Sequence, residues 1–242
     1  MFAKETYIRR RQQLKATLKS GLLLFLGNDE CGMNYADNTY HYRQDSTFLY
    51  FFGSDYAGLA AIIDVDEDKE IIFGDELTID DIVWTGVQPT IKEKCERVGI
   101  TETMPMAQLA TYLKNAQAKG QTIHFLPPYR GEQQVWLQEL LGIAPAAQSA
   151  AASMKFIRAV INQRNYKSAE EIEALERAFH LGYEMHATAM RMCREGVVER
   201  EIAGAIEGIA KSKGLGLSFG SIVSQHGETL HNLNCDGVLE RG

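Results

Sequence analysis

The sequence contains no apolar run that approaches the ~20 residues of a membrane-spanning helix. Its longest apolar runs, residues 22–26 and 59–63, have the length of a β-strand. Residues 1–11 are polar and lack the apolar core of a secretory signal peptide. We therefore expect a cytoplasmic protein that does not bind or cross a membrane.

The sequence also has fewer positively charged than negatively charged residues. The chain of 242 residues carries 25 lysines and arginines against 32 aspartates and glutamates, which gives a formal net charge of −7. A chain of this charge repels phosphate backbones at long range, so nucleic acid is not an expected partner. The local basic cluster at residues 9–11 is expected to form a solvated helix face.

Paired cysteines and the well-marked catalytic motifs are missing too. The four cysteines show no C-x-x-C spacing, so we expect free thiols at Cys31, Cys95, Cys193 and Cys235. The sequence lacks H-E-x-x-H, G-x-S-x-G, the phosphate-binding loop and G-x-G-x-x-G. Composition and spacing by themselves therefore indicate an α/β protein and no particular reaction.

The histidines give only a weak signal for a metal site. His180 and His186 are six residues apart, so they lie on different faces of an expected helix and cannot bind one metal together. His226 and His231 are five residues apart in a turn-rich stretch, where a metal pair is possible but weakly indicated.

Hydrophobic periodicity and turn residues predict a mixture of strands and helices up to about residue 141. Such a mixture indicates an α/β layer domain. The Ala-rich stretch 144–153 is expected to be a connector or a surface loop. Strands are predicted at 22–26, 48–52, 59–65, 70–73 and 122–126, and helices at 7–19, 107–118 and 133–141.

The character of the sequence changes near residue 167. Ser168 and Glu171 have the spacing of a capping box, and apolar residues at helical spacing predict a long amphipathic helix over 168–193. A second helix is expected from about Glu199, with Gly214 at its end, followed by a strand at 219–223. We place the domain boundary at residue 160, within a transition between 155 and 167.

The segment 40–53, YHYRQDSTFLYFFG, resembles the Y-x-Y-R-Q-x-S-x-F-x-Y-x-x-G signature of the aminopeptidase P N-terminal domain. We expect a structural role for it, with Phe48, Tyr50 and Phe52 alternating along a strand. The triplet Trp84-Thr85-Gly86 resembles a W-x-G segment of the same domain. The resemblance implies that Trp84 is a substrate-binding residue near the channel of a neighbouring subunit; an ordinary core or surface aromatic is the alternative.

Three segments in the second part resemble the opening of the family's catalytic, "pita-bread" domain: KSAEEI at 167–172, SIV at 221–223 and LHN at 230–232. The resemblance implies that His231 is the first active-site histidine, a catalytic residue that is not a metal ligand. It would donate a hydrogen bond to the substrate or to the tetrahedral species. His226 matches no family role.

The implied architecture is a creatinase-like α/β domain at residues 1–160, with a mixed sheet and flanking helices. An incomplete pita-bread domain is implied at 161–242, which makes the chain α+β overall. Enzymes of this family hold two divalent metal ions, usually Mn²⁺, on two aspartates, a histidine and two glutamates. The resemblance places all of these ligands beyond Gly242, so we expect no metal in this chain.

The implied function of the parent protein is that of an Xaa-Pro aminopeptidase, which acts on peptides with proline at the second position. The resemblance also implies a homo-oligomer, a dimer or a tetramer. This chain alone is expected to be inactive. Xaa-Pro dipeptidase, creatine amidinohydrolase and a non-catalytic protein-binding module of the same fold stay open as alternatives.

Overall fold

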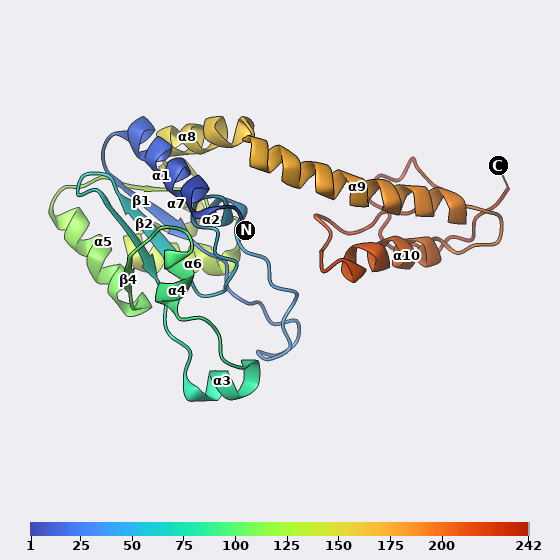
Figure 1. Ribbon diagram of the computed structural model, residues 1–242, viewed down its shortest axis with the longest axis horizontal. Helices are drawn as coiled ribbons and strands as arrows, with labels where there is room; N and C mark the ends of the chain where they lie inside the picture. The colour runs from blue at the N-terminus through green and yellow to red at the C-terminus, as the bar shows by residue number, and fades with distance from the viewer. Residues whose placement is uncertain (242) are drawn as a thin grey trace. The chain divides into compact units, whose positions relative to one another are not determined.

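The computed structural model describes residues 1–241, which separate into two compact units (Figure 1). Unit 1 comprises Met1–Tyr166 and unit 2 begins at Lys167. The boundary expected at residue 160 falls inside helix α8 (Met154–Asn165), and the two units divide just after that helix ends.

Unit 1 is built on a five-stranded mixed sheet with the strand order β4-β3-β2-β1-β5. The central hairpin is antiparallel, while β5 pairs with β1, and β4 with β3, in parallel. The carboxyl ends of β1, β3, β4 and β5 therefore meet at one edge of the sheet. The strands are β1 (Leu22–Leu26), β2 (Ala60–Asp64), β3 (Lys69–Phe73), β4 (Glu102–Met104) and β5 (Ile123–Phe125).

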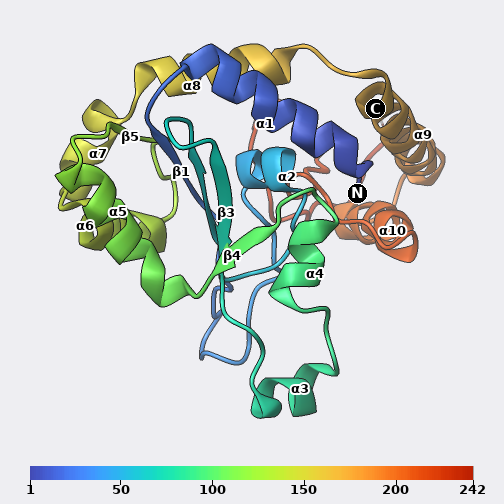
Figure 2. The same cartoon turned by 60° about the vertical axis from the view of Figure 1, so that its left-hand side comes forward.

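Helices cover both faces of this sheet (Figure 2). One face packs against α1 (Lys4–Leu18), α2 (Ser46–Phe52), α4 (Ile91–Glu96) and α8, and the other against α5 (Leu109–Ala118) and α6 (Gly131–Leu141). Alternate residues of β1 enter the two cores, Leu23 and Phe25 on one side and Leu22 and Leu24 on the other. This arrangement confirms the α/β layer domain, and it explains why the strands are apolar on both faces.

The first and last helices of unit 1 pack against each other in antiparallel fashion. The Lys155 ammonium donates a hydrogen bond to the carbonyl of Leu18, and the Gln163 amide donates one to the carbonyl of Arg10 at 2.9 Å. Lys155, early in α8, therefore lies beside the end of α1, and Gln163, late in α8, lies beside its middle. The pairing closes the sheet face that the first core occupies.

The prediction of a strand at residues 48–52 is wrong, because this segment is helix α2. The Asp45 carboxylate accepts hydrogen bonds from the backbone of Thr47 and Phe48, at 2.9 and 2.8 Å, and so caps the helix. Gly53 ends it in the left-handed conformation at φ 58°. A short, uninterrupted apolar run fits a buried helix as well as a strand, and here the cap decides between them.

The expectation of a solvated helix face at residues 9–11 is wrong for two of its three arginines. Arg9 is exposed, but Arg10 and Arg11 are 6% and 0% exposed. Arg11 lies on the same helical stripe as the buried residues Leu14 and Leu18. A charge at a core position requires partners, and Arg11 has four.

The partners of the Arg11 guanidinium come from three elements or their ends. Its Nε donates to the Glu70 carboxylate of β3 at 2.7 Å, and its Nη1 donates to the carbonyl of Phe51 in α2 at 2.9 Å. Its Nη2 donates to the carbonyls of Val98 and Gly99, at 2.8 and 3.4 Å, in the turn after α4. Each nitrogen of the buried guanidinium therefore donates at least one hydrogen bond.

The Ala-rich stretch 144–153 is not a loop. It contains α7 (Pro145–Ala151), with proline in the first turn, where the missing N–H costs nothing. The side chain of Ser153 then caps α8 through the backbone N–H of Phe156 at 3.3 Å. Alanine is the strongest helix former, so the composition favours the helix over the expected connector.

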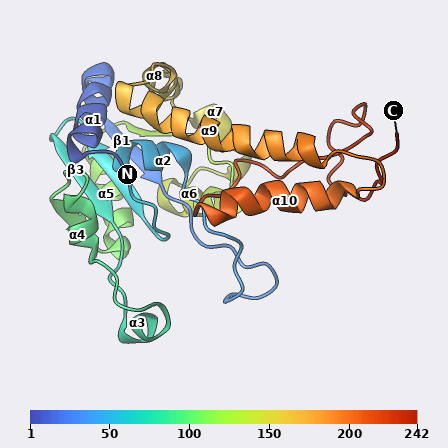
Figure 3. The ribbon, with the colours of Figure 1, turned by 45° about the vertical axis from the view of Figure 1, so that its right-hand side comes forward.

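Unit 2 contains two helices that lie side by side, α9 (Ala169–Met192) and α10 (Glu199–Ser212) (Figure 3). The capping box of Ser168 and Glu171 is present as predicted. The strand expected at 219–223 is not formed, because no strand within residues 1–241 pairs with this segment. Over the same residues, no helix combines the length and the apolar character needed to cross a bilayer.

Replacing the buried arginine should destabilise unit 1 strongly. Arg11→Met leaves the Phe51 and Val98 carbonyls without their donor, and we expect a loss of about 3 kcal/mol in the free energy of unfolding. Arg9→Gln removes an exposed charge from the same helix and should cost less than about 1 kcal/mol. Urea denaturation of both variants measures the difference, and equal losses would contradict the role assigned to Arg11.

Candidate functional site

His231 lies in a loop of unit 2 that follows α10 and is closed by its own side chains. The Ser224 hydroxyl oxygen accepts hydrogen bonds from the backbone N–H of His226 at 3.0 Å and from the Asn232 amide at 2.9 Å. The backbone N–H of Thr229 donates to the carbonyl of His226 at 2.9 Å. Residues 224–232 therefore form a compact loop, which we call the histidine loop.

The two histidines of this loop differ in their surroundings. The His226 ring lies 3.2 Å from the Glu228 carboxylate and is exposed. His231 is exposed as well, and within residues 1–241 no hydrogen bond or ion pair occupies its imidazole. The imidazole of His231 is therefore accessible to a group from outside the chain.

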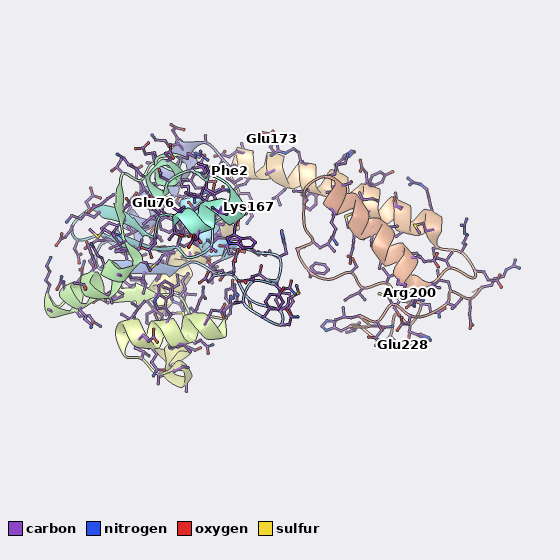
Figure 4. All side chains as sticks on the ribbon, turned by 90° about the horizontal axis from the view of Figure 1, so that it is seen from below. Phe2, Glu76, Lys167, Glu173, Arg200 and Glu228 are labelled. Atoms are coloured by element: carbon purple, nitrogen blue, oxygen red, sulfur yellow. The ribbon has the colours of Figure 1, made fainter. Side chains whose placement is uncertain are left out.

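A buried carboxylate joins the histidine loop to the first turn of α10. Glu199 is only 1% exposed, and its Oε1 accepts a hydrogen bond from the backbone N–H of Gln225 at 2.8 Å. Its Oε2 accepts one from the backbone N–H of Gly237 at 3.1 Å. Figure 4 labels Arg200 and Glu228, which mark this end of α10 and the histidine loop beside it.

The segment after the histidine loop is tied to the same end of α10 by its backbone. Val198 and Val238 form an antiparallel bridge, and the N–H of Leu239 donates to the carbonyl of Val197 at 2.9 Å. The Gln225 amide donates to the carbonyl of Val238 at 3.0 Å. The polypeptide is therefore anchored on both sides of the histidine loop.

The other histidines and the cysteines do not assemble into a site. His180 pairs with Glu184 at 3.4 Å on an exposed face of α9, and His124 Nδ1 lies 2.8 Å from the Ser153 hydroxyl in unit 1. All four cysteines are free thiols, as expected. No group of three or more His, Cys, Asp or Glu residues that could hold a metal ion occurs among residues 1–241.

The signature segment 40–53 contributes a buried hydrogen-bond network to unit 1. The hydroxyl of Tyr42 and the amide of Gln44 both donate to the carbonyl of Tyr56 at 2.8 Å. The Gln44 carbonyl oxygen in turn accepts from the backbone of Asn28 and Asp45 at 2.8 Å. Burial raises the pKa of Tyr42, so the hydroxyl stays a donor at all ordinary pH values.

A cavity of about 350 Å³ opens beside this network. Its walls include the exposed side chains of His41 and Arg43, together with Tyr129 and Arg130 from the chain after β5. Tyr42 and Gln44 also border it, but their hydrogen bonds are used within the fold. The structural role expected for the segment is consistent with these contacts.

Trp84 lies on α3 (Ile79–Thr85), a short helix held away from the rest of unit 1 by the chain on either side (Figures 1 and 2). A capping box of Thr78 and Asp81 closes its first turn. None of its residues is buried, and the Trp84 side chain is 88% exposed. Trp84 is therefore not a core residue of this unit, and its neighbours Val83 and Val87 are 76% and 85% exposed.

Sequence reasoning missed Glu199. An acidic residue in the first turn of a helix ordinarily stabilises the helix dipole from a solvated position, and nothing in the local sequence indicates burial. The glycine at position 237 is a related signal in the sequence. The structure explains it, because a Cβ at this position would lie 2.7 Å from the Glu199 carboxylate.

Residues 7–125 match the model of one protein family, described as "Aminopeptidase P, N-terminal domain". Among curated relatives, a "Probable Xaa-Pro aminopeptidase" of Metarhizium acridum is 24% identical over 87% of this chain and 41% of its own length. The Xaa-Pro aminopeptidase of Escherichia coli is 24% identical over 84% of this chain and 48% of its own length. The chain thus spans less than two thirds of either relative.

Solved structures show the same fold. A low-pH form of aminopeptidase P from E. coli aligns with 100% of this chain and 57% of its own, at a TM-score of 0.82 and 22% identity. The same enzyme with the inhibitor Pro-Leu aligns at a TM-score of 0.81 and 22% identity, over 98% of this chain and 56% of its own. Residues 7–125 are an aminopeptidase P N-terminal domain, in a chain that is similar over most of its length to Xaa-Pro aminopeptidases.

Proposed function

We propose that this chain supplies the N-terminal part of an Xaa-Pro aminopeptidase, which hydrolyses the bond between the first residue of a peptide and a proline at the second position. The observation that carries the proposal is the extent of the similarity. The similarity covers 84–98% of this chain and includes residues of both units. It covers 35–51% of the relatives' own length.

The proposed reaction uses two divalent metal ions, Mn²⁺ being the expected species. When bound, such ions would supply Lewis-acid chemistry, which activates water and stabilises negative charge. Residues 1–241 do not fit this role, because they contain no suitable cluster of His, Cys, Asp and Glu. The ligands would have to come from residues outside this chain.

Within the chain, we assign the catalytic role to His231. A neutral imidazole can donate one N–H, and the free ring of His231 is available to donate it to an oxygen of the substrate. Negative charge builds on that oxygen as a nucleophile adds to the peptide carbonyl, so the hydrogen bond strengthens in the transition state. The anchored ends of the histidine loop support this assignment, because they restrict the movement of the segment that carries His231.

Trp84 is our proposed substrate contact, made in a homo-oligomer across to a neighbouring subunit. Its 88% exposure and the lack of buried residues in α3 leave the indole free to contact a group from outside unit 1. An indole offers a large rigid apolar face, which suits the ring of a proline residue.

The chain alone should show no peptidase activity. An Xaa-Pro peptide incubated with residues 1–242 and Mn²⁺ should remain intact by mass spectrometry, because no described cluster can hold the metal pair. The full-length protein that contains this chain should release the N-terminal residue under the same conditions. If the isolated chain released the N-terminal residue in a metal-dependent reaction, the proposal that the metal ligands lie outside this chain would be wrong.

His231→Ala in the full-length enzyme should lower kcat/KM by about 10²–10³-fold, the usual cost of losing one such donor. The fall should appear in kcat, because the hydrogen bond strengthens only as charge develops. Bound metal, measured by elemental analysis, should stay at the wild-type level. His226→Ala is the matched control and should leave kcat/KM nearly unchanged. Loss of the metal in His231→Ala would instead identify His231 as a metal ligand.

Trp84→Ala should raise KM for an Xaa-Pro peptide by about tenfold and leave kcat nearly unchanged, because the indole binds substrate and does no chemistry. Val87→Ala removes an equally exposed apolar side chain next to α3 and should leave both constants unchanged. Steady-state kinetics on the two oligomeric variants provide the test. An unchanged KM in Trp84→Ala would remove Trp84 from the substrate site.

A further inference from the structure

The Glu199 carboxylate is the most deeply buried acidic group of unit 2, with 1% of the residue exposed. Burying a carboxylate is costly unless hydrogen bonds replace its hydration. Here each oxygen has a backbone partner, Gln225 for one and Gly237 for the other. Hydrogen bonds to an ionised acceptor are roughly twice as strong as neutral ones, so the pair forms a firm link.

The two backbone donors lie on either side of His231 in the sequence. Gln225 is the second residue of the histidine loop, and Gly237 lies five residues after the loop ends. One side chain therefore holds both ends of the segment that carries His231. The adjacent Ser224 closes the loop itself, so the loop and its anchor are continuous.

The backbone approaches Glu199 as closely as a glycine permits. A Cβ at Gly237 would lie 2.7 Å from Oε1 and 2.8 Å from Cδ of the Glu199 side chain, well inside van der Waals contact. An alanine at this position would have to displace the carboxylate. The anchor can thus be disturbed from either side, by changing Glu199 or by changing Gly237.

We propose that Glu199 is a positioning residue for His231 in the peptidase reaction, acting through the two ends of the histidine loop. This assignment rests on the proposed function, in which His231 donates to the developing charge. Glu199 itself is buried and does not touch the substrate. A carboxylate suits the role because it offers two acceptors and no donor, whereas an amide would present an N–H to one of the two backbone N–H groups.

A double-mutant cycle in the full-length enzyme tests the coupling. Glu199→Gln keeps the shape of the side chain and loses one anchor, so we expect kcat to fall by about 10- to 100-fold, the cost of a small misplacement of a catalytic group. KM and bound metal should be unchanged. In the His231→Ala background the same substitution should change kcat by less than about twofold, because two residues that act through one interaction are not additive.

Gly237→Ala provides a second variant that leaves Glu199 intact, and it should reproduce the same pattern of kcat and non-additivity. Glu201→Gln removes an exposed carboxylate from the same turn of α10 and should leave kcat unchanged. Hydrogen exchange on the 242-residue chain adds a direct readout of the anchor. Glu199→Gln should accelerate exchange at the amides of residues 225 and 237 and leave the strands of unit 1 unaffected.

The outcomes separate this inference from the proposed function. If His231→Ala leaves the rate unchanged, the catalytic assignment of His231 fails, and the positioning role falls with it. A second outcome is that His231→Ala lowers kcat, but Glu199→Gln lowers kcat by the same factor in the wild-type and the His231→Ala enzymes. In that case Glu199 has only a structural role, and this inference alone is overturned. Unchanged exchange at residues 225 and 237 would show that the anchor does not hold the loop.

Discussion

The guanidinium of Arg11 is the interaction on which the packing of unit 1 depends. It joins α1 to the end of α2, to β3 and to the turn after α4. Two other side chains of α1 add polar links, Lys15 to Glu70 and Arg10 to the carbonyl of Tyr50. Dispersion and hydrophobic burial favour many arrangements of such elements. A planar cation with donors in fixed directions favours one, because displacement leaves a buried charge or a buried carbonyl unpaired.

Unit 2 uses the opposite charge for a similar purpose. The Glu199 carboxylate binds two backbone N–H groups of a segment that contains no helix or strand within residues 213–241. Gln44 in unit 1 does the same with a neutral amide, holding Asn28 and Tyr56 on either side of the signature segment. In each case an irregular segment gains a defined position from one buried polar side chain rather than from secondary structure.

The regular elements were largely predictable from the sequence because their signals are local. The apolar run of β1, the hairpin of β2 and β3, and the capping box of α9 all depend on neighbours within a few positions. The errors had both local and distant causes. Residues 48–52 become helical because Asp45 caps them and a core accepts one face, and residues 219–223 have no strand to pair with.

The residues of the candidate site were harder to predict, because their roles depend on distant parts of the chain. His231 and Trp84 were identified only through resemblance to a family, and their roles are still predictions. Arg11 and Glu199 were not identified, because burial of a charge depends on donors and acceptors that lie 26 to 88 residues away in the sequence. A charged residue on a helix looks the same in sequence whether its partner is water or a backbone group of a remote segment.

The antiparallel pairing of α1 with α8 has a consequence for how the chain acquires its structure during synthesis. Gln163 must reach Arg10, so α1 leaves the ribosome long before its partner α8 has been synthesised. Contacts of such separation raise the entropic cost of closing the chain and slow folding. They also bring a residue near the end of unit 1, Gln163, beside one near its start, Arg10, and termini that lie close together favour circular permutation. A permutant with residue 166 joined to residue 1 would convert the slow closure into a local hairpin of two helices.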